Sequence, residues 1–239
     1  MPSPQVHDTP HPVPPMSDRR LCLGLFQRRE CVVPTWRGLL VFVAVVGTVA
    51  VLFVRNVYQF LAVNEPAPGG ALVIEGWASD FAMDAAIVEF HRHPYAAFLV
   101  TGGPIEKGAV FSQFHTYAEW GEATLEKLGV APDQVHAVPA PEVDKDRTYA
   151  SALALKAWLE QHHLPTDRVN VLSMGSHARR SRYLFQRAFG PGTHIGITAL
   201  EDPGWTQKPW WTTSAGVRSV LNELMAFTYA RFFFSPERG

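Results

Sequence analysis

Residues 71–103 read ALVIEGWASDFAMDAAIVEFHRHPYAAFLVTGG, and this stretch decides the fold. It opens with the continuous apolar run Ala71–Glu75 and closes with a second run, Ala96–Thr101, and each run ends at glycine. Between the two runs, Asp80–Arg92 has the pattern of a helix. Short apolar runs without alternation are typical of strands that are buried on both faces. The stretch therefore predicts a strand, a helix and a second strand parallel to the first.

The same alternation continues to the end of the chain. Further strands are expected at Gln134–Val138, Arg168–Ser173 and His194–Ala199, and further helices at Phe114–Leu128, Thr148–His162, Ala178–Phe189 and Ala215–Phe233. Alternating apolar strands and helices pack as a parallel sheet with helices on both faces. We therefore expect residues 71–234 to form an α/β domain with a doubly wound, Rossmann-like, mostly parallel sheet, preceded by one transmembrane helix.

An apolar segment without charges precedes this domain. Residues 38–54 read GLLVFVAVVGTVAVLFV, and VYQFLAV at 57–63 extends the segment beyond Arg55. A spanning helix needs roughly 20 apolar residues. A buried core helix should not be apolar on every face, and a signal peptide should be followed by a small-residue cleavage site, which this sequence lacks after the run. The pattern predicts a retained single-pass anchor over residues 36–63.

The segments on either side of the anchor differ in composition. Residues 1–35 begin with a proline-rich stretch, so we expect a disordered cytoplasmic tail. Residues 64–70 read NEPAPGG and predict a short linker. Positively charged residues favour the cytoplasmic side. Only Arg55 closely follows the charge-free run 38–54, whereas five arginines precede it: Arg19, Arg20, Arg28, Arg29 and Arg37. The N-terminus is therefore expected inside the inner (plasma) membrane, with the domain periplasmic or extracellular.

The overall composition excludes several classes of protein. The chain has 239 residues and a formal net charge of −1, which argues against a nucleic-acid binder that works through a broad basic field. Its two cysteines, Cys22 and Cys31, both precede the span, so no disulfide framework holds the domain. An H-x-H pair at His91 and His93 lacks the further ligands that zinc needs, and we expect no metal site.

Ligands of parallel α/β sheets bind beyond the carboxyl ends of the strands, which directs attention to the residues that follow each strand. The segment SHARRSR at 176–182 begins a predicted helix, and a helix N-terminus offers free N–H groups to an anion. His177 and Arg180 would add donors that suit phosphate or carboxylate, the alternative being an exposed basic turn. The candidate ligand-binding residues are Glu75, Gly102, Gly103, Asp146, Arg147, Thr148, Ser176, His177 and Arg180.

Individual roles can be assigned to some of these residues. Gly102 and Gly103 would let the backbone turn tightly or approach a ligand. Asp146 is expected to accept a hydrogen bond from Arg180 or from a ligand hydroxyl, and Thr148 to cap the helix it opens, with helix capping alone as the alternative. No G-x-S-x-G nucleophile elbow, G-x-G-x-x-G turn or Walker A sequence occurs, so the residues identify no catalytic group and no cofactor.

Four short motifs, in order, resemble those of the YdcF/SanA/ElyC-like family, also described as domain of unknown function 218. They are V-T-G-G at 100–103, G-V at 129–130 before a strand, D-R-T at 146–148 and S-H-A-R-R-S at 176–181. Trp210, Trp211, Gly216 and Glu223 are similar to that family's closing helix. The resemblance covers residues 71–234, and it implies a Rossmann-like domain and, for anchored members, a role in envelope or peptidoglycan-linked processes.

Together these features lead to one expectation and two alternatives. The expectation is an envelope protein whose outer domain binds, and acts on or only recognises, a phosphate-bearing cell-wall or lipid-linked precursor. One alternative is a non-catalytic factor that organises protein partners in envelope biogenesis. The other is a small-molecule transferase or hydrolase.

Overall fold

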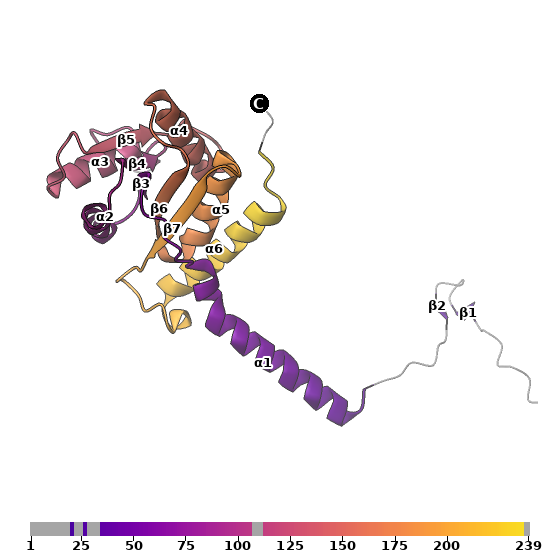
Figure 1. Cartoon of the computed structure of the whole chain (residues 1–239). Helices are drawn as coiled ribbons and strands as arrows, with labels where there is room; N and C mark the ends of the chain where they lie inside the picture. The colour runs from indigo at the N-terminus through magenta and orange to yellow at the C-terminus, as the bar shows by residue number, and fades with distance from the viewer. Residues whose placement is uncertain (1–19, 22–25, 28–33, 107–111, 237–239) are drawn as a thin grey trace, which may run out of the picture. The chain divides into compact units, whose positions relative to one another are not determined.

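A five-stranded sheet forms the centre of the domain in the computed structural model, which describes residues 20–21, 26–27, 34–106 and 112–236 (Figure 1). Its strands are β3 (Ala71–Glu75), β4 (Ala97–Gly102), β5 (Val135–Pro139), β6 (Arg168–Met174) and β7 (His194–Leu200). Their order is β5-β4-β3-β6-β7, and every neighbouring pair is parallel. The chain thus builds the sheet outward from β3 in one direction and then from β6 in the other, so the order reverses between β3 and β6.

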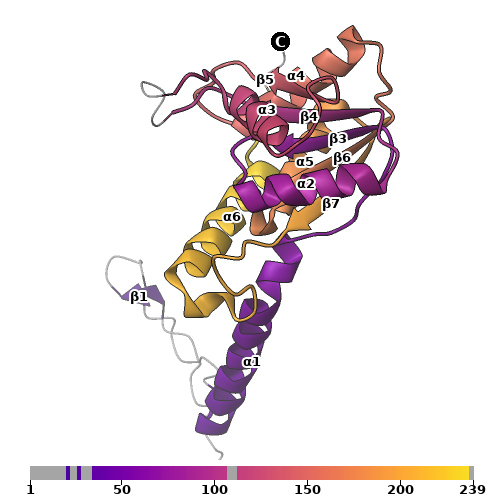
Figure 2. The same cartoon turned by 90° about the vertical axis from the view of Figure 1, so that its left-hand side faces the viewer.

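Helices cover both faces of this sheet (Figure 2). On one face, Leu72, Ile74 and Phe98 pack against α2 (Asp80–Arg92) and α3 (Tyr117–Lys127). On the other face, the alternate strand residues pack against α4 (Arg147–Gln161) and α5 (Ala178–Phe189). Strands with helices on both sides have no face in water, which explains why their sequences are apolar throughout. The α/β class and the parallel sheet predicted from the sequence are confirmed.

Helix α3 begins three residues later than the expected start at Phe114. Thr116 accepts a hydrogen bond from the N–H of Glu119, and the Glu119 carboxylate accepts from the N–H of Thr116. This reciprocal pair is a capping box, which satisfies two N–H groups at the start of a helix. The helix therefore starts where the capping box is, at Tyr117.

Helix α1 (Trp36–Leu61) is long and apolar enough to cross a membrane. Its last turns nevertheless belong to the domain: Val57, Tyr58 and Leu61 are buried against Trp205, Trp210 and Val220. Trp210 opens the short 3₁₀ helix η3 (Trp210–Thr212), which precedes α6 (Ser214–Phe232), and its indole N–H donates to the carbonyl of Val54 at 2.9 Å. The expected anchor over residues 36–63 therefore has an exposed part followed by a part that is packed into the domain.

The expected linker over residues 64–70 connects α1 to β3 and is bonded to the sheet. The N–H and carbonyl of Glu65 pair with Ile197 of β7 at 2.8 and 3.0 Å. Ala67 is buried and donates its N–H to the side-chain oxygen of Asn170 in β6 at 3.0 Å. A proline- and glycine-rich composition predicts a loop, but it does not reveal that the loop is bonded to an edge of the sheet.

Of the expected tail, Arg20–Leu21 and Phe26–Gln27 form an antiparallel pair, β1 and β2, and residues 1–19, 22–25 and 28–33 lie outside the described residues.

If the end of α1 is part of the core, Leu61→Ala will lower the free energy of unfolding by about 3 kcal/mol, as for other leucines removed from packed cores. Leu61 is fully buried, whereas Val49 on the same helix is 61% exposed. Urea unfolding of the detergent-solubilised chain, followed by tryptophan fluorescence, measures the difference. Val49→Ala is the control, and an equal effect of the two substitutions would contradict the packing of α1 into the domain.

Candidate functional site

A cavity of about 540 Å³ lies at the carboxyl edge of β3 and β4, next to the place where the strand order reverses. Eight of the nine candidate ligand-binding residues line it; the exception is Ser176. The other lining residues are Trp77, Thr101, Pro104, Glu106, Tyr117, Lys145, Ser151 and Glu223. Segments that are far apart in the sequence thus meet in one polar cavity, as expected for the carboxyl edge of a parallel sheet.

Glu75 ends the central strand with its carboxylate buried, with only 4% of the residue exposed. Three side chains donate to it. Ser173 of β6 donates at 2.7 Å, and Ser181 of α5 and Nε2 of His177 each donate at 3.2 Å. Burial alone would raise the pKa of Glu75, but the charge and hydrogen bond of His177, together with the hydrogen bond from Ser173 and the charge of Arg180, outweigh burial and lower it. Glu75 is therefore an ionised carboxylate that is held in place by the protein.

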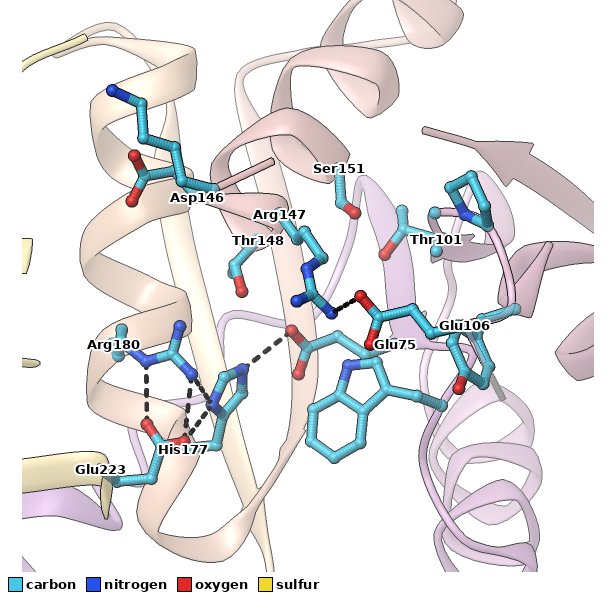
Figure 3. Close-up of a pocket in the computed structure, with 16 residues that line it drawn as sticks. Glu75, Thr101, Glu106, Asp146, Arg147, Thr148, Ser151, His177, Arg180 and Glu223 are labelled. Atoms are coloured by element: carbon cyan, nitrogen blue, oxygen red, sulfur yellow. Dashed lines mark hydrogen bonds and ion pairs between the residues drawn. The ribbon is translucent and has the colours of Figure 1, made fainter. Parts of the chain in front are cut away.

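Arg180 is held by Glu223 of α6 (Figure 3). Its Nε and Nη2 donate to the two carboxylate oxygens at 2.8 and 3.0 Å, the paired geometry that suits a guanidinium best. Nδ1 of His177 lies 3.0 Å from the same Oε1 of Glu223 and 2.8 Å from Nη2 of Arg180. Both N–H groups therefore converge on one carboxylate oxygen. The expected bond from Arg180 to Asp146 is wrong, because Glu223 occupies that role.

The charges in this network shift the pKa values of its members. Burial would lower the pKa of His177, but Glu75 on one side and Glu223 on the other raise it to about 9. Burial would raise the pKa of Glu223, and its hydrogen bonds with His177 and Arg180 lower it to about 2 instead. The four side chains thus alternate in charge: carboxylate, imidazolium, carboxylate, guanidinium.

The helix that presents its first turn to the cavity is α4. Asp146 precedes it with φ 59°, in the left-handed region, and no side-chain cap bond is made at this position. The first N–H groups of a helix lack partners within the helix and carry partial positive charge. Thr148 lies within this first turn and directs its hydroxyl toward the space between Arg180 and Glu75 (Figure 3). The expectation that Thr148 caps the helix is therefore wrong; it is the second residue of α4.

Arg147 closes one side of the cavity. Its guanidinium lies 2.5 Å from the Glu106 carboxylate, and both side chains are more than half exposed. An exposed ion pair of this kind stabilises little, because water competes for both partners. Arg147 can therefore exchange Glu106 for a ligand at small cost, unlike Arg180, whose partner is part of the buried network.

The two glycines after β4 have different reasons to be there. A Cβ at Gly102 would lie 2.7 Å from Cβ of Tyr117, so this glycine lets α3 pack closely on the strand. A Cβ at Gly103 would meet open space, because its nearest neighbour, the carbonyl oxygen of Pro141, would be 3.9 Å away. Gly103, rather than Gly102, leaves room for a ligand.

Thr101 has a buried hydroxyl without a hydrogen-bond partner among the described residues, although it lines the cavity. An unpaired buried polar group is costly, and such groups in folded proteins call for an explanation such as a bound water or ligand. Trp77 contributes an apolar wall: its ring contacts the imidazole of His177 edge-on, with the centroids 5.1 Å apart. Both residues lie at strand ends, but only their place in the fold shows that they line the same cavity.

Ser176 lies away from the cavity. Its hydroxyl is 2.7 Å from that of Ser219, so it connects the short 3₁₀ helix η2 (Gly175–His177) to α6. The helical turn already begins at Gly175, and the N–H of Ala178 donates to the carbonyl of Gly175. The 3₁₀ turn η2 thus leads directly into α5, and the cavity is lined by residues from the starts of both α5 and α4.

No protein-family model matches the chain, and neither the curated proteins nor the solved structures contain a match.

The network makes stability depend on pH in two ranges. His177 binds its proton more tightly when folded, so its stabilisation is complete below pH 6.5 and is lost as the pH rises toward 9. Glu223 has a lowered pKa, so its stabilisation is complete above pH 4.5 and is lost as the pH falls toward 2. The contribution of the network is therefore largest between pH 4.5 and 6.5.

The alkaline part of this profile tests His177 directly. Between pH 6.5 and 9 the wild-type chain should lose on the order of 3 kcal/mol from this group. His177→Gln should unfold more easily at pH 6 and lose much less stability over that range, as measured by urea unfolding at a series of pH values. His91→Gln, at an exposed position, is the control. An alkaline slope that survives in His177→Gln would show that another group is responsible.

Proposed function

We propose that this chain is a membrane-anchored envelope protein of the YdcF/SanA/ElyC-like family, whose Rossmann-like domain binds a phosphate-bearing cell-wall or lipid-linked precursor. The observation that carries the proposal is the wall of the cavity where the first turn of α4, Thr148 and Arg180 converge. Helix N-termini and guanidinium groups are the donors that proteins use most often for phosphate. The cavity lies where the strand order reverses, which is where doubly wound sheets bind ligands.

The pairing of the charged side chains in the cavity favours a ligand that carries an anionic group. Glu75 neutralises His177, and Glu223 neutralises Arg180, so the buried part of the site carries no excess charge. The exposed pair of Arg147 and Glu106 can open, which leaves the Arg147 guanidinium and the N–H groups of α4 for the ligand. Both ring nitrogens of His177 already face carboxylates, so its place in the site is to hold Arg180 and Glu75 in position. Recognition is therefore better supported than catalysis.

The proposed topology places the domain outside the cytoplasm. Five arginines precede the charge-free run 38–54 and only Arg55 follows it closely, which favours a cytoplasmic N-terminus. An alkaline phosphatase fused after Phe234 should be active, since that enzyme needs the periplasm, and green fluorescent protein fused at the same place should be dark when exported by the Sec pathway. The opposite result from the two reporters would reverse the topology and remove the envelope precursor from the domain's reach.

The unpaired hydroxyl of Thr101 gives a sharp test of ligand binding. Thr101→Val keeps the shape of the side chain and removes a buried polar group that lacks a partner among the described residues, so stability should stay the same or rise. If the ligand forms a hydrogen bond with this hydroxyl, the affinity of Thr101→Val for the ligand should be about tenfold lower than that of the wild-type chain. One hydrogen bond contributes roughly 1 kcal/mol or more in a buried site. Calorimetric titration of the full chain in nanodiscs with a polyprenyl phosphate, a nucleotide-linked wall precursor and inorganic phosphate measures the affinity, and urea unfolding measures the stability.

Thr198 supplies the matched control. Its hydroxyl is also buried without a partner among the described residues, but it lies on β7 and does not line the cavity. Thr198→Val should therefore leave affinity unchanged. Arg147→Ala should weaken the binding of all three ligands, because it removes a guanidinium that is available to the ligand. This guanidinium is exposed and does not belong to the buried network. If neither Thr101→Val nor Arg147→Ala changes the binding of any ligand that the wild-type chain binds, the cavity is not the binding site.

A further inference from the structure

Helix α6 has three faces, and two of them are occupied. One packs on the end of α1 and on Trp205 through Val217, Val220, Leu224 and Phe227. The second serves the site, with Ser219 bonded to Ser176 and Glu223 bonded to Arg180. The third face is exposed and largely apolar, at a spacing of three and four residues; it consists of Leu221, Met225, Tyr229 and Phe232. Met225 is 64% exposed and Phe232 74%, unusually high values for apolar side chains on a folded domain.

The exposed face of α6 is directed away from the site. Around the helix axis, the side chains that pack on α1 and the side chains that serve the site are about a quarter of a turn apart, and the exposed side chains lie on the other flank of the α1 contact. Figures 1 and 2 both show α6 beside the end of α1. The site lies on the sheet side of α6, so the exposed face lies on the side remote from the sheet.

Two contacts show which residues of α1 lie next to α6. Trp210, just before α6, bonds to Val54, and Phe227 packs edge-on against Phe60 with the ring centroids 5.7 Å apart. Between Trp210 and Phe227 the chain passes through much of α6. Over the same stretch, the contacted residue of α1 changes only from Val54 to Phe60, which is six residues or about 9 Å at 1.5 Å per residue. Helix α6 therefore crosses α1 obliquely and stays near its end.

The length of α1 places this end at a membrane surface. The exposed part from Trp36 to Phe53 would be about 27 Å long, close to the roughly 30 Å thickness of a bilayer's hydrocarbon core. Val54, where the domain begins, would then lie at the boundary of the core. Trp211, which is 41% exposed beside this point, is the kind of side chain that favours the headgroup region.

The charges of α6 suit the same surface. The helix contains one acidic residue, Glu223, and that side chain is turned into the site. Arg218 and Arg231 are exposed, so the outward side of α6 is apolar and basic without a carboxylate. Apolar and aromatic side chains with flanking arginines are typical of helices that lie on anionic bilayers.

We propose that the exposed face of α6, formed by Leu221, Met225, Tyr229 and Phe232, rests on the surface of the bilayer in which α1 is anchored. This second contact rests on the proposed membrane span. It gives the domain a fixed orientation, because a single helix alone would leave it free to tilt. It also joins the bilayer to the site, since the same helix carries Glu223 and so holds Arg180 and His177.

Site-directed fluorescence in vesicles tests this contact. Single cysteines replace Met225, Leu221, Val46 or Val88 in a full chain that carries Cys22→Ser and Cys31→Ser, and each is labelled with the environment-sensitive dye NBD. Val46 lies in the span, and Val88 is a 56% exposed apolar residue of α2, which packs on the sheet and not on α1. The chains are reconstituted into vesicles of phosphatidylethanolamine and phosphatidylglycerol that contain a spin-labelled phosphatidylcholine, which quenches dyes in contact with lipid.

The expected result is strong quenching at Val46, clear but smaller quenching with a blue-shifted emission at Met225 and Leu221, and none at Val88. Quenching at Val46 with Met225 and Leu221 as unquenched as Val88 would overturn the α6 contact and leave the span intact. Absence of quenching at Val46 would overturn the span and, with it, both proposals. A blue shift at Met225 that depends on protein concentration and is not quenched by lipid would show that a second copy of the chain covers this face, and would also overturn the proposal.

Discussion

Glu75 ends the central strand with a charge inside the protein, and the surrounding structure is arranged to compensate that charge. Two serine hydroxyls and the imidazolium of His177 surround its carboxylate. His177 in turn needs a second acceptor, which Glu223 provides, and Glu223 also holds Arg180. Removing one partner from such a network leaves a buried charge without compensation, which is more costly than the pair is stabilising. The network therefore fixes how β3, β6, α5 and α6 meet.

Because Glu223 belongs to α6, the site and the part of the domain that packs on α1 share one helix. Another face of α6 packs on the last turns of α1, where Leu61 is fully buried. The apolar helix that is long enough to span a membrane is thus continuous with the core of the domain.

The fold could be predicted from the sequence because each strand is buried on both faces and is therefore a short apolar run. The strands of the main sheet begin and end within about one residue of the predicted bounds, and the capping pair Thr116 and Glu119 explains the late start of α3. The burial of Val57, Tyr58 and Leu61 could not be predicted, because apolar residues at the end of a span look the same whether lipid or protein covers them. Glu65 and Ala67 bond through backbone atoms, which carry no sequence signal.

The position of the candidate site could be predicted from the sequence, but most of the hydrogen bonds and ion pairs between its side chains could not. The rule that ligands bind beyond strand ends places Glu75, Asp146 and His177 together, and the structure brings them to one cavity. The partner of Arg180 was missed because Glu223 lies 43 residues away on a helix with little periodicity. Ser176 was misplaced because η2 turns its side chain toward α6, which the residue type alone does not show.

We propose that a phosphate group binds where the first turn of α4, which contains Thr148, faces Arg180. Crystals of the full chain soaked with tungstate, a heavy analogue of phosphate, would test it by anomalous scattering. We expect the strongest tungsten peak inside the cavity, within hydrogen-bond distance of the N–H groups of Arg147 or Thr148. Tungstate bound only at surface arginines outside the cavity, with the cavity empty at a concentration that saturates those surface positions, would contradict it.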